Sequence, residues 1–260
     1  MSDNQKAYLK RIKREKKLIY IIQIIIVCGL LILWQILSQK RIINDFIYSS
    51  PLKIVNTLIG LIKGHNLFNH LLRTLKEIFI AFSLGSLLGL LIAILLYEFR
   101  LLAKIFEPFL IVLNSLPKVA LGPMIIIIAG ANIKSVIIMT LLINLIVTIL
   151  NIYNGFVNID STKITLMKSF KASKIQTLKY LVLPGSLNTI VSALKINVSM
   201  TLIGVIMGEF LVSKEGIGYL IIYGTQIFDM NLVMSGIFVL IIMSIIIYLL
   251  VSKLLKTKEN

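Results

Sequence analysis

Three long stretches of this chain contain no charged residue. They have the sequences IIQIIIVCGLLILW, IIMTLLINLIVTIL and FVLIIMSIIIYLLV. A lipid bilayer has a hydrocarbon core of roughly 30 Å, which a helix of about 20 apolar residues can cross. Because backbone polar groups find no water in lipid, such segments form helices. The sequence predicts six spans, over residues 18–37, 77–97, 105–129, 134–153, 187–212 and 232–252.

The composition also indicates a protein that lies mostly in lipid. Hydrophobic residues make up 58% of the 260 residues, charged residues only 15%, and the mean hydropathy is +0.96. A soluble domain has roughly 25% charged residues. A β-barrel would need segments of alternating polarity, whereas these runs are apolar on every side. The predicted fold class is therefore all-α, a polytopic membrane protein with about six transmembrane helices.

The positive charges predict which loops face the cytoplasm, because Lys and Arg are enriched there. With the N-terminus inside, 17 of the 27 Lys and Arg residues lie on the cytoplasmic side and 8 outside. Lys118 and Lys195 fall within spans. This predicts a multi-pass membrane protein with both termini in the cytoplasm. Segment 18–37 is too long for the core of a signal peptide, so we expect a retained anchor helix.

Three parts follow from this topology: a basic N-tail over 1–17, the anchor over 18–37, and a transmembrane core over 45–253. The net charge of +16 could suggest nucleic acid as a partner. The cations flank membrane spans without interleaved aromatic residues, which is typical of contact with anionic lipid. We therefore expect the lipid bilayer, and no nucleic acid, as a partner.

The motifs of catalytic chemistry are missing from the sequence. The chain has no Walker A phosphate-binding motif and no H-E-x-x-H metal motif. The histidines, His65 and His70, lie in a predicted outer loop, and Cys28 is the one cysteine. We expect no catalytic residue, no metal site and no cofactor in this chain. A transport role is favoured, and an ATP-independent secondary transporter or channel remains an alternative to an ATP-driven one.

The loop over 154–186 is too polar to cross a membrane, yet its pattern predicts two short helices. Asp160 is suited to cap the first helix, because its carboxylate can accept hydrogen bonds from the first-turn amides. A second helix over 173–182 is expected to stop before Pro184, since the residue before proline disfavours the α region. The pattern by itself fits either a docking element or a solvated hairpin.

Short motifs in this loop and on both sides of it resemble the membrane permease subunit of bacterial ABC importers, in the subgroup for sulfonates, taurine and nitrate. The resemblance implies a place in the bacterial inner membrane. The matching segments, in order along the chain, are Ser50-Pro51, Leu116-Pro117-Lys118-Val119-Ala120, Asp160, Ala172-Ser173, Val182-Leu183-Pro184, Leu194-Lys195-Ile196, Gly208-Glu209-Phe210 and Gly216-Ile217-Gly218-Tyr219-Leu220-Ile221. The resemblance covers roughly residues 45–222, and the ordered set is more specific than any one motif.

The resemblance implies a type I ABC importer permease fold and its partners. These are a second permease copy in a homodimer, two ATPase subunits that bind ATP and Mg²⁺, and an external substrate-binding protein. The implied cargo is a small, anionic or heterocyclic solute, such as a sulfonate, nitrate, taurine or a vitamin precursor. The first short helix of the loop would be the coupling helix that docks on the ATPase. The implied coupling residues are Asp160, Ile164, Leu166, Met167, Phe170, Lys171, Ala172 and Ser173.

One departure from the family pattern concerns the shape of this loop. The family has a glycine between the two short helices where this chain has Lys171. Because a residue other than Gly in the left-handed region costs about 1–2 kcal/mol, we expect Lys171 to extend the first helix.

The spans contain small residues and a few polar ones. Small residues recur every fourth position at Ala81, Gly85, Gly89 and Ala93, and again at Gly204 and Gly208. Small residues allow close helix contacts in lipid, within one bundle, which we favour, or between subunits. Three prolines, Pro108, Pro117 and Pro123, are expected to break the third span and make it a candidate pore liner.

Charged residues inside spans are costly unless they snorkel to the interface or serve a function. Lys118 or Lys195 could face the pathway and offset an anionic substrate. Glu209 is more simply a structural partner of a nearby polar group. The pathway candidates are Pro117, Lys118, Lys195 and Glu209.

Overall fold

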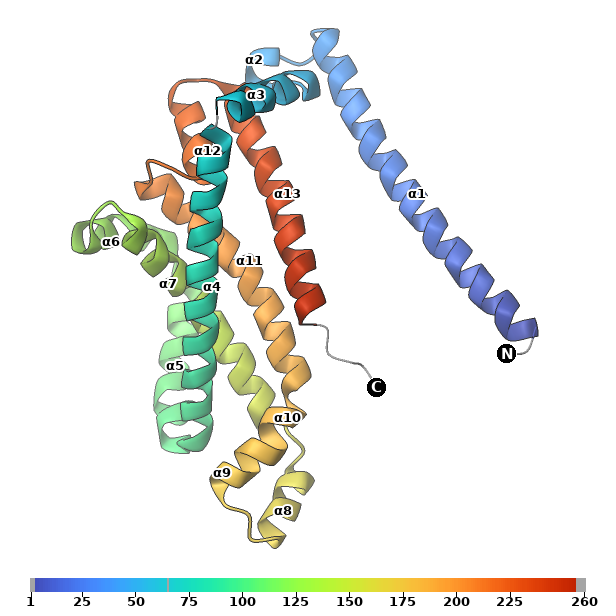
Figure 1. Cartoon of the computed structure of the whole chain (residues 1–260). Helices are drawn as coiled ribbons and strands as arrows, with labels where there is room; N and C mark the ends of the chain where they lie inside the picture. The colour runs from blue at the N-terminus through green and yellow to red at the C-terminus, as the bar shows by residue number, and fades with distance from the viewer. Residues whose placement is uncertain (1–2, 65, 256–260) are drawn as a thin grey trace.

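The computed structural model describes residues 3–64 and 66–255, and its regular elements there are all helices (Figure 1). The first half of the chain forms α1 (Asp3–Gln39), α2 (Asp45–Tyr48), α3 (Pro51–Lys63), α4 (Asn66–Glu98), α5 (Arg100–Ser115), η1 (Lys118–Leu121) and α6 (Gly122–Ala129). The second half forms α7 (Ile133–Val157), α8 (Ser161–Ser169), α9 (Lys174–Thr177), η2 (Leu178–Val182), α10 (Leu183–Gly185), α11 (Leu187–Val212), α12 (Ile217–Gln226) and α13 (Met230–Leu254).

Five of the described helices are long and apolar enough to cross a membrane: α1, α4, α7, α11 and α13. A sixth span is formed if α5 is taken together with η1 and α6, which bend away from it by 88°. The predicted all-helical membrane fold with about six spans is thus confirmed. α1 also continues through most of the basic tail, so tail and anchor form one helix.

The bend in the third span lies at one of its three prolines. α5 ends at Ser115, and Pro117 precedes the 3-10 turn η1. Pro108 lies inside α5 without ending it, contrary to our expectation. A proline removes a single backbone donor, and a helix can absorb that loss by a kink. Pro123 lies in the first turn of α6, where its missing N–H would have no helical partner in any case.

The core is a three-helix arrangement in which α7 packs against both α4 and α11. Buried side chains line α7 along its whole length, from Val136 through Asn144 to Phe156. One apolar cluster joins α4, α7, α11 and α13 around Val136, and another joins α4, α7 and α11 around Phe156. α7 is therefore the central helix of the bundle.

The small residues predicted to lie at helix contacts do so within this chain. A Cβ built on Gly85 would lie 2.6 Å from Oδ1 of Asn144, and one on Gly89 would lie 2.6 Å from the Thr148 methyl group. On α11, Gly204 lies against Thr140 of α7 in the same way. Because area burial drives helix association only weakly in lipid, such close backbone contacts carry much of the packing.

A chain of hydrogen bonds crosses the same three helices. Asn144 donates to Thr201 (2.9 Å), Thr201 donates to Asn197 (3.0 Å), and Asn197 donates to Ser86 (3.0 Å). These side chains are buried or partly buried, and they come from α7, α11 and α4. The network pairs polar groups that would otherwise be costly in an apolar core.

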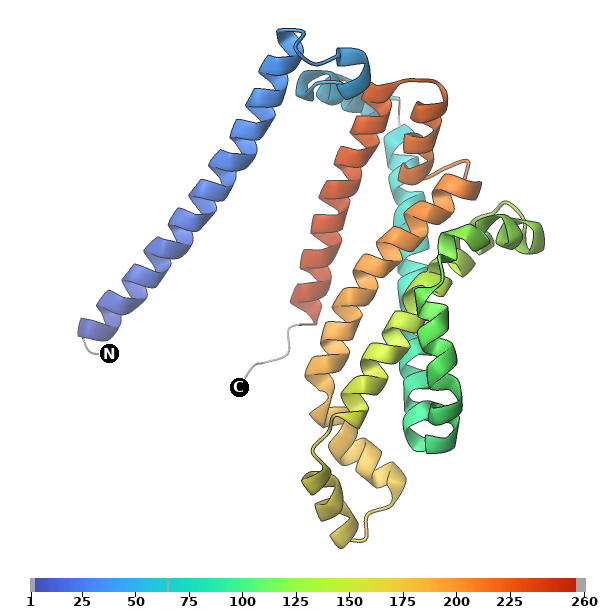
Figure 2. The same cartoon turned by 180° about the vertical axis from the view of Figure 1, so that it is seen from behind.

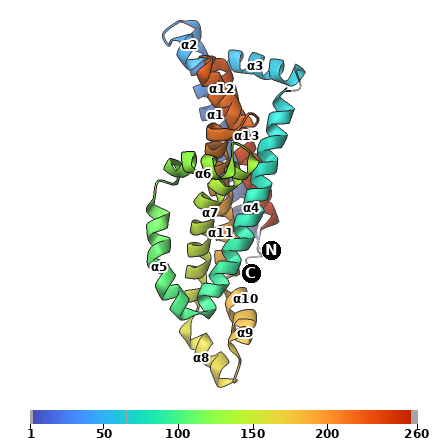
Figure 3. The ribbon, with the colours of Figure 1, turned by 90° about the vertical axis from the view of Figure 1, so that its left-hand side faces the viewer.

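The connections are divided between the two ends of the bundle (Figure 2). At one end, here called the α8 end, lie the α4–α5 junction and α8 to α10, and the N-terminal end of α1 and the C-terminal end of α13 point toward it. At the other, the α12 end, lie α2, α3 and α12. α6 lies across the bundle between the two ends (Figure 3).

Candidate functional site

The α8 end carries a segment of short helices, α8, α9, η2 and α10, whose first helix begins with a polar N-cap. α8 begins at Asp160, whose side chain accepts a hydrogen bond of 2.8 Å from the backbone N–H of Thr162. This bond holds the pKa of the exposed Asp160 carboxyl below its ordinary value, because it favours the ionised form. The N-cap predicted from the sequence is present.

The end of α8 differs from the prediction. Lys171 adopts a left-handed conformation (φ 58°) and does not extend the helix. The Ala172 N–H donates to the Met167 carbonyl (3.0 Å), and the Lys171 N–H donates to the Lys168 carbonyl (2.8 Å). This pair of bonds is a Schellman motif, which pairs carbonyls that the helix end leaves free. It offsets the cost of the left-handed backbone, so Lys171 makes the turn that glycine makes in the family pattern.

The second part of the segment is also longer than predicted. Ser173 and Gln176 form a capping box at the start of α9, with bonds of 2.7 and 3.2 Å. Helical backbone then continues through a π-turn, η2, and through Pro184 to Gly185. The expected stop before Pro184 is therefore wrong. In a π-turn the hydrogen bonds join residues i and i+5. Beside the proline, the Ser186 hydroxyl donates to the Val182 carbonyl (2.6 Å).

Apolar contacts fix this segment to the bundle. Val182 is fully buried and packs in the cluster of Phe156, with Leu178 and Ile159 against it. Thr177, the last residue of α9, is also buried. The segment is thus a capped structure held on the ends of the core helices.

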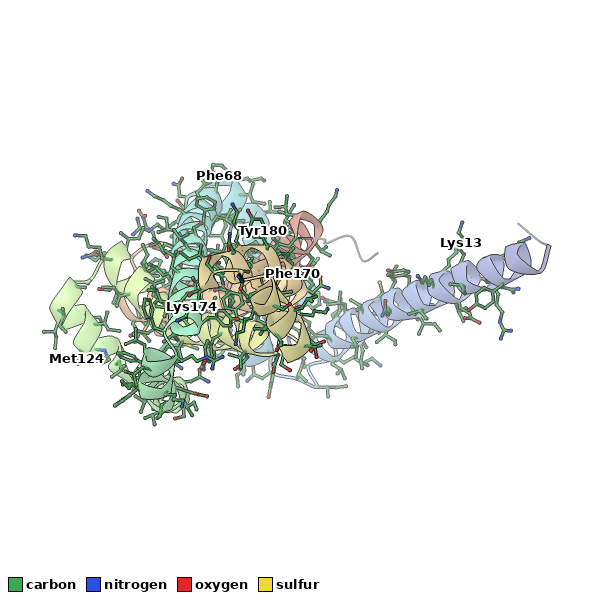
Figure 4. The ribbon with its side chains drawn as sticks, turned by 90° about the horizontal axis from the view of Figure 1, so that it is seen from below. Lys13, Phe68, Met124, Phe170, Lys174 and Tyr180 are labelled. Carbon is green, nitrogen blue, oxygen red and sulfur yellow. The ribbon has the colours of Figure 1, made fainter. Side chains whose placement is uncertain are left out.

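The opposite side of the segment is exposed and partly apolar. Leu166 is 55% exposed and Phe170 74%, and Ile164 and Met167 are half-buried. Figure 4 looks onto this end, with Phe170, Lys174 and Tyr180 labelled. The sequence analysis missed Ile175 (72% exposed) and Tyr180 (64%). It had assigned the docking surface to the first short helix only, although the apolar residues of the second could have been counted too.

Basic side chains surround these apolar groups. Those of the segment are exposed, namely Lys163, Lys168, Lys171, Lys174 and Lys179. Lys179 lies 5.3 Å from the centre of the Tyr180 ring. An open depression runs beside the α8 cap and is lined by Asp160, Thr162, Lys163, Thr165, Leu166 and Ser169. The surface therefore combines apolar side chains with a positive border.

The pathway candidates do not come together with this segment or with one another. Pro117 and Lys118 lie at the bend between α5 and α6, where the Lys118 ammonium donates to the Asn114 carbonyl (2.8 Å). This bond uses a carbonyl in the last turn of α5. Lys195 is half-buried on α11, two residues before Asn197 of the buried network.

Glu209 lies at the α12 end, and its carboxylate links three helices. It accepts a 2.6 Å hydrogen bond from the Thr74 hydroxyl of α4 and another of 2.6 Å from the Gly218 N–H of α12. The Ile217 N–H donates to the Thr74 hydroxyl (2.8 Å), and the Gly216 N–H to Nδ1 of His70 (3.0 Å). Side chains from other helices thus satisfy the free amides at the start of α12. Glu209 has the geometry of a structural partner.

Two glycines make room for this carboxylate. Gly216 has a φ of +114°, and a Cβ there would overlap the Glu209 carboxyl group. A Cβ on Gly218 would lie 2.8 Å from Oε2 of Glu209. The G-I-G sequence after Glu209 therefore lets the backbone approach the carboxylate.

A comparison with protein families decides what this arrangement belongs to. Residues 85–256 match the family described as "Binding-protein-dependent transport system inner membrane component". The chain belongs to this family. It is a multi-pass permease of the inner membrane, a non-catalytic subunit of an ABC importer whose ATP is hydrolysed by a partner ATPase. The matched region includes α8 to α10, the bend and α12. The ATP-independent alternative does not fit this family.

Relatives extend the similarity over most of the permease. A probable ABC transporter permease protein of Haemophilus influenzae is 30% identical over 89% of this chain and 94% of its own length. The formylaminopyrimidine transport permease protein ThiX of Halalkalibacterium halodurans is 29% identical over 86% and 89%. A putative aliphatic sulfonates transport permease protein SsuC of Bacillus subtilis is 25% identical over 88% and 84%.

A solved structure agrees with the fold. The inward-facing MetNI methionine ABC transporter matches 74% of the permease and 96% of the solved chain, with a TM-score of 0.65 at 18% sequence identity. At this identity the match supports the fold alone. The predicted fold class of an ABC importer permease is confirmed.

Proposed function

We propose that this permease forms the translocation path for a small, anionic or heterocyclic solute. A binding protein outside the cell delivers the solute, and two ATPase subunits drive its import. The named relatives carry formylaminopyrimidine and aliphatic sulfonates, and a riboflavin permease of Chloroflexus aurantiacus is also similar. Each of these solutes has a negative group or a nitrogen heterocycle, which supports the proposed class of cargo.

The observation that carries the coupling proposal is the exposed apolar surface of α8. Residues 160–173 act as the coupling helix and dock in a groove of the ATPase. Fully burying a large apolar side chain such as Phe170 contributes about 1.5–3 kcal/mol, and Phe170 is 74% exposed in the free chain. Leu166, Ile164 and Met167 lie beside it on α8 and add to the contact.

The α8 end also has the stiffness that coupling requires. Asp160 caps the first helix, a Schellman motif ends it, and a capping box begins the second. Val182 anchors the segment in the core cluster of α4, α7 and α11. A push on α8 is therefore transmitted to the spans, because the segment has few unfixed backbone positions at which it could bend.

The topology proposed here puts the α8 end in the cytoplasm, where the ATPase lies. The N-terminal end of α1 and the C-terminal end of α13 point toward this side. The segments expected on this side carry most of the Lys and Arg residues. The N-tail over 1–17 and the anchor over 18–37 precede the permease core over 45–253. Residues 1–2 of the N-tail and His65 lie outside the described residues.

A second copy of the chain completes the path in this proposal. The bent third span leaves apolar side chains of α6 uncovered: Ile127 is 84% exposed, and Ile128 and Met124 are also exposed. Irregular backbone inside a membrane is tolerated where protein or a water-filled cavity covers it. A homodimer would cover the bend and place Lys118 at the boundary of the pathway, where its charge can offset an anion.

The experiment measures assembly with the ATPase subunit of the same transporter. Phe170→Ala should weaken the complex about thirtyfold, the equivalent of about 2 kcal/mol. Phe68→Ala is the matched control, since Phe68 is similarly exposed but lies on α4 at the α12 end. Equal affinity of the ATPase for both variants would refute the assignment of the coupling helix.

A further inference from the structure

Two carboxyl groups meet inside the α12 end of the bundle. Glu77 of α4 and Glu209 of α11 are both 0% exposed. Oε1 of Glu209 accepts a 2.6 Å hydrogen bond from Thr74, three residues before Glu77, so the two acids lie beside each other. Thr74 and Glu77 lie one turn apart on the same face of α4. Glu209 therefore lies against the face of α4 that carries Glu77.

The hydrogen-bond donors around this pair do not suffice for two carboxylates. Both oxygens of Glu209 accept bonds, from Thr74 and from Gly218. Oε1 of Glu77 accepts from Nε of Arg73 (2.8 Å). Oε2 of Glu77 is buried, and no donor in residues 3–64 and 66–255 reaches it. A buried acceptor without a donor costs about 1–3 kcal/mol, and more if it is charged.

The nearby charges do not balance two carboxylates either. One guanidinium, that of Arg73 on α4, contacts Glu77, and its Nη1 also lies 4.0 Å from a carboxylate oxygen of Glu215 in the loop before α12. His70 of α4 accepts from Gly216 through Nδ1 and stacks on Tyr219 of α12. The adjoining apolar cluster includes Val136 of α7 and Leu240, Met243 and Ile247 of α13.

We propose that Glu77 and Glu209 form a proton-binding site that holds one proton between their carboxyl groups. Two carboxylates that share a site disfavour each other's ionisation, because the two negative charges repel. One shared O–H gives Oε2 of Glu77 its missing hydrogen bond, whichever of the two carboxyls carries the proton. The proton belongs to the pair.

The site joins the three helices that meet at the α12 end. The shared proton links α4 to α11, while Gly218 and Thr74 extend the link to α12. Removing the proton brings two negative charges into contact inside the protein. Because the native permease holds a proton there that the unfolded chain releases, its stability should fall as the pH rises.

Infrared spectroscopy of the purified full-length permease in lipid nanodiscs tests the site. The wild type should show the carbonyl stretching band of a neutral carboxylic acid at neutral pH, and the band should shift in heavy water. Glu209→Gln and Glu77→Gln should each lose it, because the remaining acid no longer faces a second carboxylate. Glu107→Gln, which changes an exposed acid of α5, should keep it.

A measurement on the wild type alone covers the case in which a variant fails to fold. Raising the pH should abolish the band and lower the melting temperature over the same interval. Absence of the band from the wild type at neutral pH, or its persistence in both Gln variants, would overturn the proposal. Docking of the ATPase on α8 is at the other end of the bundle and does not enter this test.

Discussion

The contact between Gly216 and Glu209 permits a sharp test of the α12 end. In Gly216→Ala the new methyl group overlaps the carboxyl group of Glu209, so the carboxyl must move. It then loses its bonds to Gly218 and Thr74, each worth about 1.5–3 kcal/mol because the acceptor is a carboxyl group. Alanine at a φ of 114° and a ψ of 166° adds about 1–3 kcal/mol of backbone strain. The expected loss is about 4 kcal/mol or more.

The assay is the melting temperature of the detergent-purified permease, followed by size-exclusion chromatography after heating. At roughly 2–4 °C for each kcal/mol in a chain of this size, Gly216→Ala should melt about 8–16 °C below the wild type. Gly60→Ala is the control, because a Cβ at Gly60 of α3 meets no atom within 4 Å. A Gly216→Ala variant that melts within about 2 °C of Gly60→Ala would refute the packing argument.

Three further predictions concern single residues. In Asp160→Ala the amide of Thr162 loses its acceptor, so hydrogen exchange in the first turn of α8 should accelerate, and equal exchange in both proteins would contradict the cap. Because the pKa of Asp160 is lowered, the wild-type cap should persist as the pH falls to the ordinary Asp range and disappear only below it. Lys171→Gly relieves the left-handed backbone and should slow proteolysis between α8 and α9, while faster cleavage would mean that the gain in chain flexibility outweighs the relief. Lys118→Met should reduce uptake of an anionic solute by the complete transporter in proteoliposomes while ATPase assembly is unchanged, and intact anion uptake would remove Lys118 from the pathway.

The spans could be predicted from the sequence because lipid imposes a simple requirement on composition and length. The bend near Pro117 was expected for a similar local reason, since proline removes a backbone donor. Its angle could not be predicted, because it depends on how α6 packs on α7 and α11. The ends of the short helices were predicted less well. At Lys171 the local cost of the backbone was judged correctly, but the two Schellman bonds that offset it were not foreseen.

The surroundings of Glu209 could not be predicted from the sequence. Thr74 is 135 residues away from it in the chain, and Glu77 stands at the first position of the predicted span 77–97. Only the fold brings α4 and α11 together at this point. Gly216 and Gly218 were visible as a motif, but the carboxylate that explains them is seen only in three dimensions.

The glycine positions of α4 and α11 constrain how the bundle can move. Asn144, Thr148 and Thr140 project from α7 into sites where the neighbouring helices have no side chain. If α4 or α11 slid or rotated relative to α7, these side chains would collide with residues larger than glycine. The three helices should therefore move as one rigid body during transport. Opening and closing of the path must then arise where this body meets α5 and α6, α13, or the second subunit.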